Sequence, residues 1–184
     1  LGSTRVDRWS YSSSKAVAEH MLWTAHRIYN LPVTVVRFFN VYGPRQRSDL
    51  VVPAMIKQAL SGKPVLLYDG GRQTRCFTFV EDAVEGIILA ATLPAATGHV
   101  FNIGRNVEVS IKELLQEIKT QIEPLTKINF EYVNTKKLYG HSYQDIPRRV
   151  PNVEKARDLL GWEAKTPLSE GLSRTITWWK NIYY

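Results

Sequence analysis

Tyr11 and Lys15 are the two residues of this chain whose types and spacing most directly suggest chemistry. They lie four residues apart in a stretch that we expect to be helical, so both side chains would project from one face. A free tyrosine has a pKa of about 10, and a nearby ammonium group favours its phenolate form. Such a pair can move a proton to or from an alcohol hydroxyl. The same spacing also occurs on ordinary surface helices, so it needs support from the rest of the chain.

The composition is that of a globular protein, with 184 residues of which 44% are hydrophobic and 22% are charged. This length allows one domain with a real core, or most of two small ones. No apolar run approaches the roughly 20 residues of a membrane-spanning helix, so we expect no membrane partner. The single cysteine, Cys76, cannot form an internal disulfide, which fits a reducing, cytoplasmic location. The four histidines are scattered, and no cluster has the spacing of metal ligands.

The net charge of +7 indicates an anionic partner. The basic residues are dispersed along the chain, apart from short groups such as Lys136-Lys137 and Arg148-Arg149. Binding of nucleic acid usually needs a basic patch or stripe. We therefore expect local phosphate sites and no nucleic-acid partner.

Helical and strand-like segments alternate along the chain, which predicts an α/β fold. The segment 32–39 is nearly continuously apolar, as in a parallel strand that is covered on both faces. The polar segment 134–151 is long and irregular, which is uncommon in a compact domain unless the segment is functional. Helices are expected over residues 11–29, 53–60, 82–91, 111–122, 152–160 and from 166 onward, and strands over 32–39, 65–68, 74–79, 99–103 and 128–133.

A nucleotide-binding sheet normally opens with a strand, a glycine-rich turn and a helix. None of the eleven glycines of this chain falls into a G-x-G-x-x-G or G-x-x-G-x-x-G pattern. We therefore expect the chain to be the carboxyl-terminal part of a larger enzyme. Since absent neighbours would leave apolar surface uncovered, we also expect poor solubility of this chain by itself.

Five sequence blocks, in this order, resemble the nucleotide-sugar epimerase/dehydratase/decarboxylase branch of the extended short-chain dehydrogenase/reductase family. The resemblance covers nearly the whole chain. It implies the last part of a Rossmann-like doubly wound parallel sheet and a smaller α/β substrate-binding domain. Residues 1–50, with the strand 99–103, would belong to the NAD-binding domain, and residues 51–184 mainly to the nucleotide-sugar-binding domain. The blocks are YSSSK (11–15), RFFNVYGPR (37–45), DGGRQTRCFTFVED (69–82), NIG (102–104) and LGW (160–162).

The resemblance implies an NAD-dependent reaction that passes through a 4-keto sugar. Tyr11 would be the acid/base, and Lys15 would hold the nicotinamide ribose while lowering the tyrosine pKa. Phe38 would lie beside the nicotinamide. The family's glycine-rich cofactor loop, and a Ser/Thr about two dozen residues before the tyrosine, have no counterpart in this sequence, so we expect this chain alone to be inactive.

The resemblance also implies a nucleotide-sugar site, with a UDP-sugar as the expected substrate. Asn40 and Arg75 would contact the diphosphate, and Tyr68 would help to shape the nucleobase pocket. Each residue has a simpler explanation: a turn for Asn40, a solvated strand arginine for Arg75 and core packing for Tyr68. Asp82 is explained by helix capping alone.

The segment 139–151 resembles a loop of UDP-glucuronate decarboxylases. In that comparison Tyr143 would contact the UDP part, and Arg149 would lie near the sugar carboxylate and the chemistry at C4. A cation suits a carboxylate that must be bound and then lost as carbon dioxide. Related epimerases and dehydratases carry similar arginines, so the outcome of the reaction stays open, and Arg148 could be a solvated neighbour. The alternative from another class is a non-catalytic module that binds UDP-sugars or a protein partner.

Finally, the resemblance implies a homodimer formed through the Tyr11/Lys15 helix. His20, Trp23 and Arg27 lie on the face away from the expected core stripe and could supply the contact, although exposed surface is the plain alternative. The expected core stripe consists of Ala18, Met21, Leu22, Ala25 and Ile28.

Overall fold

A computed structural model of the protein describes residues 5–6, 9–123, 127–139 and 145–183. Helices and strands alternate, so the predicted α/β class is confirmed. Among the described residues, no helix is both long and apolar enough to cross a membrane. The helices are α1 (Trp9–Tyr29), α2 (Val51–Leu60), α3 (Val80–Thr92), α4 (Ile111–Ile122), α5 (Thr135–Tyr139), α6 (Glu154–Leu160) and α7 (Leu168–Tyr183), with 3-10 turns η1 (Asp69–Gly71) and η2 (Pro94–Ala96).

The strands of the described residues form four pairs, three of them parallel. In the pair β1–β6 the register runs from Val35 opposite Val100 to Phe38 opposite Ile103. Parallel pairing needs crossover connections, and α3 lies on the crossover between these two strands. The strands are β1 (Val35–Phe38), β2 (Val41–Tyr42), β3 (Val65–Tyr68), β4 (Thr74–Cys76), β5 (Thr78–Phe79), β6 (Val100–Ile103), β7 (Glu108–Ser110) and β8 (Phe130–Val133); β2–β5 and β3–β8 are also parallel, and β4–β7 is antiparallel.

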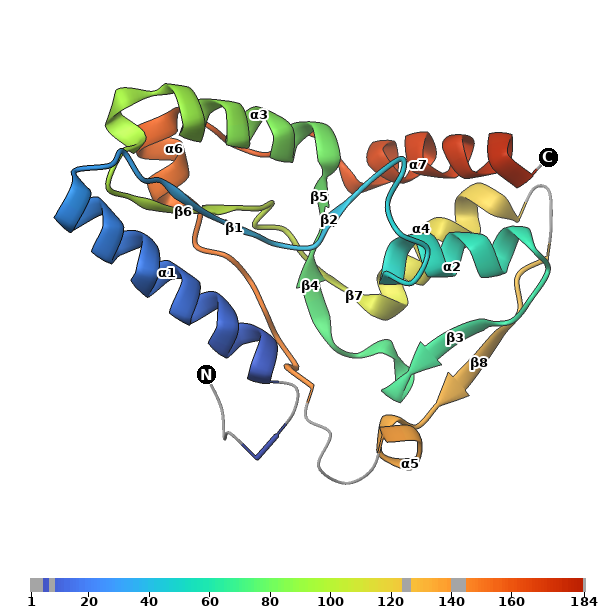
Figure 1. Cartoon of the computed structure of the whole chain (residues 1–184). Coiled ribbons are helices and arrows are strands. Elements are labelled where there is room, and N and C mark those ends of the chain that lie inside the picture. Colours follow the sequence, from blue (N-terminus) through green and yellow to red (C-terminus); the bar gives the residue numbers. More distant parts are fainter. Residues whose placement is uncertain (1–4, 7–8, 124–126, 140–144, 184) are drawn as a thin grey trace.

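The first hydrophobic core joins β6 to α3 and α6, on the left of Figure 1. Phe101 and Ile103 of β6 are fully buried there, and Trp162 lies directly after α6. The Trp162 indole donates a hydrogen bond of 2.9 Å to the carbonyl oxygen of Asp82 in α3. This bond satisfies the polar edge of the largest buried side chain and ties the chain after α6 to α3.

The second core lies on the right of Figure 1, where α2, α4 and α7 pack against one another and α2 also packs against β3. The helix α4 begins with the predicted capping box: the Ser110 hydroxyl accepts from the Glu113 N–H at 3.1 Å, and the Glu113 carboxylate accepts from the Ser110 N–H at 2.7 Å. Ile56, Leu67, Leu114, Ile118 and Leu172 are among its fully buried side chains. The boundary between two domains at residue 50 stays a prediction.

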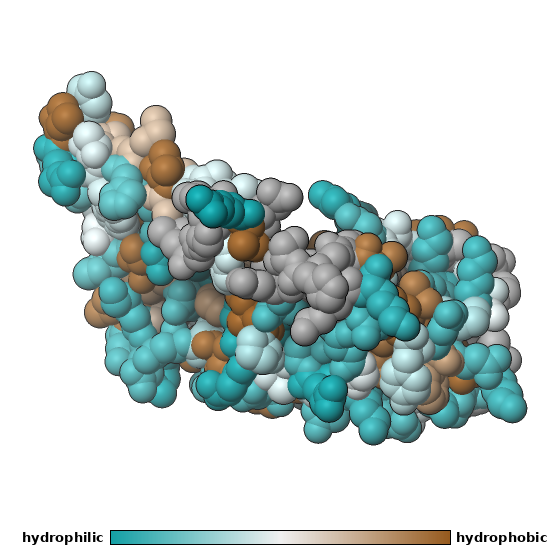
Figure 2. Space-filling model, turned by 90° about the horizontal axis from the view of Figure 1, so that it is seen from below, coloured by the Kyte–Doolittle hydropathy of each residue, from teal (hydrophilic) through white to brown (hydrophobic). Residues whose placement is uncertain are grey.

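The helix α1 contains no buried residue, so the prediction of a core stripe on it was wrong for this chain. Met21 is 68% exposed and Ile28 is 66% exposed. The half-buried side of the helix instead includes Trp23, and Glu19 on that side forms an ion pair with Arg37 of β1. Figure 2 shows apolar side chains exposed on the lobe at its upper left, where α1 projects from the rest of the molecule.

Two further expectations need correction. The segment 134–151 is not irregular throughout, because Thr135–Tyr139 forms the helix α5. Asp82 does not cap α3, whose N-cap is Phe79. The Asp82 carboxylate accepts two hydrogen bonds of 3.0 Å from Thr166, one from its N–H and one from its hydroxyl. Asp82 therefore fixes the start of the segment that leads into α7.

Candidate functional site

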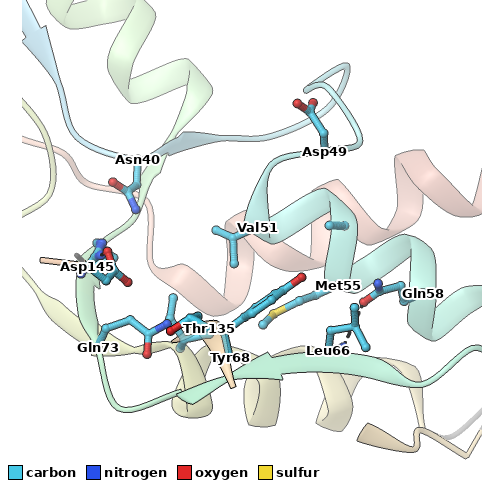
Figure 3. Close-up of a pocket in the computed structure, with 13 residues that line it drawn as sticks. Asn40, Asp49, Val51, Met55, Gln58, Leu66, Tyr68, Gln73, Thr135 and Asp145 are labelled. Atoms are coloured by element: carbon cyan, nitrogen blue, oxygen red, sulfur yellow. Dashed lines mark hydrogen bonds and ion pairs between the residues drawn. The ribbon is translucent and has the colours of Figure 1, made fainter. Parts of the chain in front are cut away.

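A cavity of about 370 Å³ lies between α2 and β3, and Figure 3 shows its lining. Apolar side chains from α2 and β3 line one end, and polar side chains from separate loops line the other. The cavity brings together Asn40, Tyr68 and Arg75, three of the residues expected to bind substrate. A pocket with one apolar end and a few convergent polar groups is typical of a small-molecule site.

The apolar end is built by strand and helix periodicity. In β3, Val65 and Leu67 are buried in the core, while Leu66 and Tyr68 point to the opposite face and line the cavity. Met55 of α2 lines the same end and is itself buried. Tyr68 is therefore a cavity residue, and core packing alone does not explain it.

Arg75 lies at the polar end and is only 8% exposed, so the explanation as a solvated strand arginine was wrong. Its Nη1 donates to the carbonyl oxygen of Thr74 at 2.7 Å, and its Nη2 donates to Oδ1 of Asp145 at 3.0 Å. A guanidinium has five donors in a fixed fork, which suits it to binding two oxygens of one anionic group.

Residues 145–149, here called the strap, run beside β4 and carry both arginines of the predicted pair. The Thr74 N–H donates to the carbonyl oxygen of Pro147 at 2.9 Å, and Thr74 forms an isolated parallel bridge with Arg148. Successive side chains of such an extended segment point to opposite sides. Arg148 pairs with Glu108 at 2.9 Å, and Arg149 donates from Nη2 to Oδ1 of Asn40 at 2.6 Å.

Arg148 is thus an anchor of the strap, although its side chain is largely exposed. Glu108 also accepts a hydrogen bond from the Thr74 hydroxyl. The Thr74 hydroxyl and Arg148 together hold the pKa of the Glu108 carboxyl below its usual range, so this carboxylate stays charged. The strap is therefore attached to β4 and β7 next to Arg149.

Asn40 follows β1 in a left-handed backbone conformation, with φ of 40°. Asparagine adopts this conformation more readily than most residues, so the explanation as a turn residue is correct. Its side chain nevertheless lines the cavity and binds Arg149. The turn places the amide at the carboxyl end of a parallel strand, where open α/β sheets bind their ligands.

Tyr11 and Lys15 lie together on α1, outside the cavity lining. The Lys15 Nζ lies 5.4 Å from the centroid of the Tyr11 ring, and the ring is 70% exposed. Phe38, at the end of β1, is 49% exposed. Tyr143 lies outside the described residues. Among the residues that the structure does describe, no group of three His, Cys, Asp or Glu side chains could hold a metal ion.

Sequence reasoning missed Asp145, Asp49 and Thr135 as cavity residues. Asp145 lies inside the loop block that drew attention to Tyr143 and Arg149, so its place in that block was the available signal. Thr135 is positioned by Asp69, which accepts from its N–H at 3.1 Å and from its hydroxyl. This contact joins residues 66 positions apart, and no local pattern indicates it.

Comparison with known proteins identifies relatives along the whole chain. Residues 4–175 match a protein-family model described as GDP-mannose 4,6 dehydratase. A UDP-N-acetyl-alpha-D-glucosaminuronate decarboxylase of Bacillus cytotoxicus is 39% identical over 184 residues, which cover 98% of this chain and 56% of the relative. The chain thus spans about half the length of the curated relatives it matches.

Two solved structures are similar in both fold and sequence. A UDP-glucuronic acid 4-epimerase of Bacillus cereus, in complex with UDP-glucuronic acid and NAD, is 28% identical with a TM-score of 0.85, over 94% of this chain and 53% of that one. A dTDP-glucose 4,6-dehydratase of Bacillus anthracis in complex with NAD is 33% identical with a TM-score of 0.82, over 94% of this chain and 52% of that one.

Proposed function

The chain belongs to the GDP-mannose 4,6 dehydratase family, and from this premise we propose that it forms the substrate-binding part of an NAD-dependent nucleotide-sugar enzyme. We further propose that the substrate is a UDP-sugar whose C6 is a carboxylate, and that the reaction is a decarboxylation. The relatives named above are all enzymes, which disfavours the non-catalytic alternative.

The observation that carries this proposal is the position of Arg75. A nearly buried guanidinium at the polar end of the cavity suits an anionic ligand, and the diphosphate of a nucleotide sugar offers two phosphate groups to bind. The nucleobase would then lie at the apolar end, against Tyr68, Leu66 and Met55. The sugar would extend past Asn40 toward Arg149.

The residues of α1 and β1 fit a nicotinamide cofactor in their chemistry. Lys15 offers an ammonium that can donate to ribose hydroxyls, and it lies next to the Tyr11 ring. Phe38 offers a half-exposed ring against which a flat cofactor ring could pack. When bound, NAD would supply the acceptor for a hydride from sugar C4.

Tyr11 would take the proton from the hydroxyl at sugar C4, with the ammonium of Lys15 lying 5.4 Å from the centroid of its ring. The resulting C4 ketone makes a C6 carboxylate the acid group of a β-keto acid. The bond between C5 and C6 then breaks, carbon dioxide leaves, and the bonding electrons pass toward the C4 oxygen. Arg149 would hold the carboxylate before this step, and the phenol of Tyr11 would stabilise the C4 oxygen by a hydrogen bond.

Two observations support the choice of decarboxylation. Arg149 of the strap binds Asn40, which lines the cavity, and a cation there would suit the carboxylate of a UDP-uronate. In addition, the Bacillus cytotoxicus relative, which is 39% identical to this chain, is named as a decarboxylase.

The assembly and location of the protein also stay proposals. We propose a homodimer through α1. Of the expected contact residues, His20 and Arg27 are exposed and Trp23 is half-buried. The exposed apolar side chains of α1 include Val17, Met21 and Ile28. Packing of a second copy of the chain against α1 would remove this apolar surface from water. The cytoplasmic location, expected from the single cysteine, is likewise a prediction.

Turnover by the full-length gene product tests the proposal. It would be assayed with NAD and, in parallel, UDP-glucuronate, UDP-N-acetylglucosaminuronate, UDP-glucose and dTDP-glucose, with release of carbon dioxide and the product sugar measured. Carbon dioxide from a UDP-uronate is expected. Turnover of a neutral sugar alone would refute decarboxylation, and no turnover of any of them would refute the enzyme assignment.

A further inference from the structure

In this structure the anion that faces the Arg75 guanidinium belongs to the protein itself. Asp145 of the strap accepts from Arg75 Nη2 at 3.0 Å, and both residues line the cavity. The Arg75 side chain is 10% exposed and that of Asp145 is 28% exposed. A carboxylate in this position makes the same kind of charge-assisted hydrogen bond as a phosphate oxygen.

The two anions compete for one positive charge. Arg75 Nη2 carries two N–H groups, but a diphosphate that binds there while Asp145 keeps its hydrogen bond would place two negative charges side by side in a partly desolvated cavity. We propose that Asp145 is a specificity residue that competes with the ligand for Arg75, so that only a ligand carrying enough phosphate charge takes the site. This inference rests on the proposed function of the cavity.

The strap makes this exchange local. Pro147, two residues after Asp145, is bound to Thr74, and Arg148, three residues after Asp145, is bound to Glu108. Asp145 Oδ1 also accepts from the Ile146 N–H at 2.8 Å, so its side chain is held by its own backbone as well as by Arg75. Rotation of the Asp145 side chain would break its hydrogen bond to Arg75 Nη2, while Arg75 keeps its bond to the Thr74 carbonyl oxygen and Arg149 keeps its bond to Asn40. Asp145 should therefore affect affinity for the diphosphate more than turnover.

Competition lowers the apparent affinity by the fraction of molecules in which Arg75 is available. Asp145→Asn keeps the shape and the acceptor for Ile146 but removes the charge, so it should bind UDP about fivefold more tightly than the wild type. The affinity for uridine, which has no phosphate, should not change. Asp145→Ala is a second variant with the same expectation.

Asp49 offers a matched control, because it also lines the cavity but its carboxylate is bound to Arg47 at 3.0 Å. Asp49→Asn removes one negative charge from the same cavity without releasing Arg75. If general charge were the cause, it would tighten UDP binding as much as Asp145→Asn does. We expect at most about a twofold effect.

The experiment is calorimetric titration of UDP and of uridine into the full-length gene product, with thermal unfolding of each variant as a check on folding. In an Arg75→Gln background, Asp145→Asn should no longer tighten UDP binding. Equal or weaker UDP binding by both Asp145 variants, with Arg75→Gln still weakening it, would overturn the competition and leave the proposed function standing. Unchanged UDP binding by Arg75→Gln would instead refute the diphosphate site itself.

Discussion

Arg149 donates a hydrogen bond of 2.6 Å from Nη2 to Oδ1 of Asn40, across 109 residues of sequence. The contact joins the turn after β1 to the strap, and hence the two sides of the cavity. Arg148, the neighbouring residue, points the other way, to Glu108. Two adjacent arginines thus have separate roles, which a single substitution at each position can distinguish.

Arg149→Gln should lower turnover by about 100-fold or more, because it removes the cation that we propose holds the substrate carboxylate in position for the reaction. Arg148→Gln is the matched control, since it removes an equal charge one residue away. It should lower turnover by less than about tenfold, through looser positioning of the strap. Steady-state kinetics of both variants checks this, and equal losses would contradict the division of roles.

Tyr11→Phe should reduce turnover by about 100-fold to 10,000-fold, because only the hydroxyl that moves the proton is lost. UDP binding should remain, since Tyr11 does not line the cavity. Tyr29→Phe is a close control: both tyrosines lie on α1 and both are 70% exposed. Kinetics and UDP titration separate the two effects. A Tyr11→Phe enzyme as active as Tyr29→Phe would exclude Tyr11 as the acid/base.

Gly171→Ala should destabilise the protein by about 1–3 kcal/mol, although alanine is normally the better helix residue. A Cβ at this position of α7 would collide with the hydroxyl of Tyr42 and crowd the ring of Phe79, both buried. Ser173→Ala, at an exposed position of the same helix, should change stability little. Chemical denaturation measures both, and a more stable Gly171→Ala would show that α7 packs differently.

The pair Glu19–Arg37, which ties α1 to β1, should make stability depend on pH. Hydrogen bonds from Arg37 lower the pKa of Glu19: Nε donates to Oε1 at 2.8 Å and Nη2 donates to Oε2 at 2.5 Å. The folded protein therefore keeps this carboxylate charged at pH values where the unfolded chain binds a proton. Its contribution is complete above the usual glutamate pKa of about 4.3 and disappears as the pH falls through the lower folded value.

Glu19→Gln should accordingly lower the melting temperature at pH 7, and the difference from the wild type should shrink as the pH falls below the usual glutamate pKa of about 4.3. The effect should be below about 1 kcal/mol, because the Arg37 side chain is half exposed. Glu85→Gln, at an exposed position of α3, serves as the control. Thermal unfolding from pH 3 to 7 gives the comparison. A Glu19 effect that grew as the pH fell would contradict the sign of the pKa shift.

Local patterns predicted most of the elements, because they depend on neighbouring residues. The Ser110–Glu113 capping box and the apolar β1 segment are examples. The helix α1 was predicted, but the burial of its expected core stripe was not confirmed, because burial depends on tertiary contacts and in this chain Met21 stays exposed. The helix α5 was missed because its five residues are too few for a periodic pattern.

The site was predictable where the family resemblance points to single residues, as for Arg75 and Asn40, which both line the cavity. Its internal pairing was not predictable. The contact between Arg75 and Asp145 spans 70 residues, and the assignment of Arg148 to Glu108 depends on the extended backbone beside Thr74. Such pairings follow from which strands meet, and nothing within a short window of sequence specifies that.

The affinity of Arg75→Lys for UDP tests whether the cavity binds a nucleoside diphosphate through Arg75. Lysine keeps the positive charge but lacks the fork of donors. We expect the full-length variant to bind UDP at least about tenfold more weakly than the wild type and to bind uridine with unchanged affinity. Equal UDP affinity in Arg75→Lys and in the wild type would contradict it.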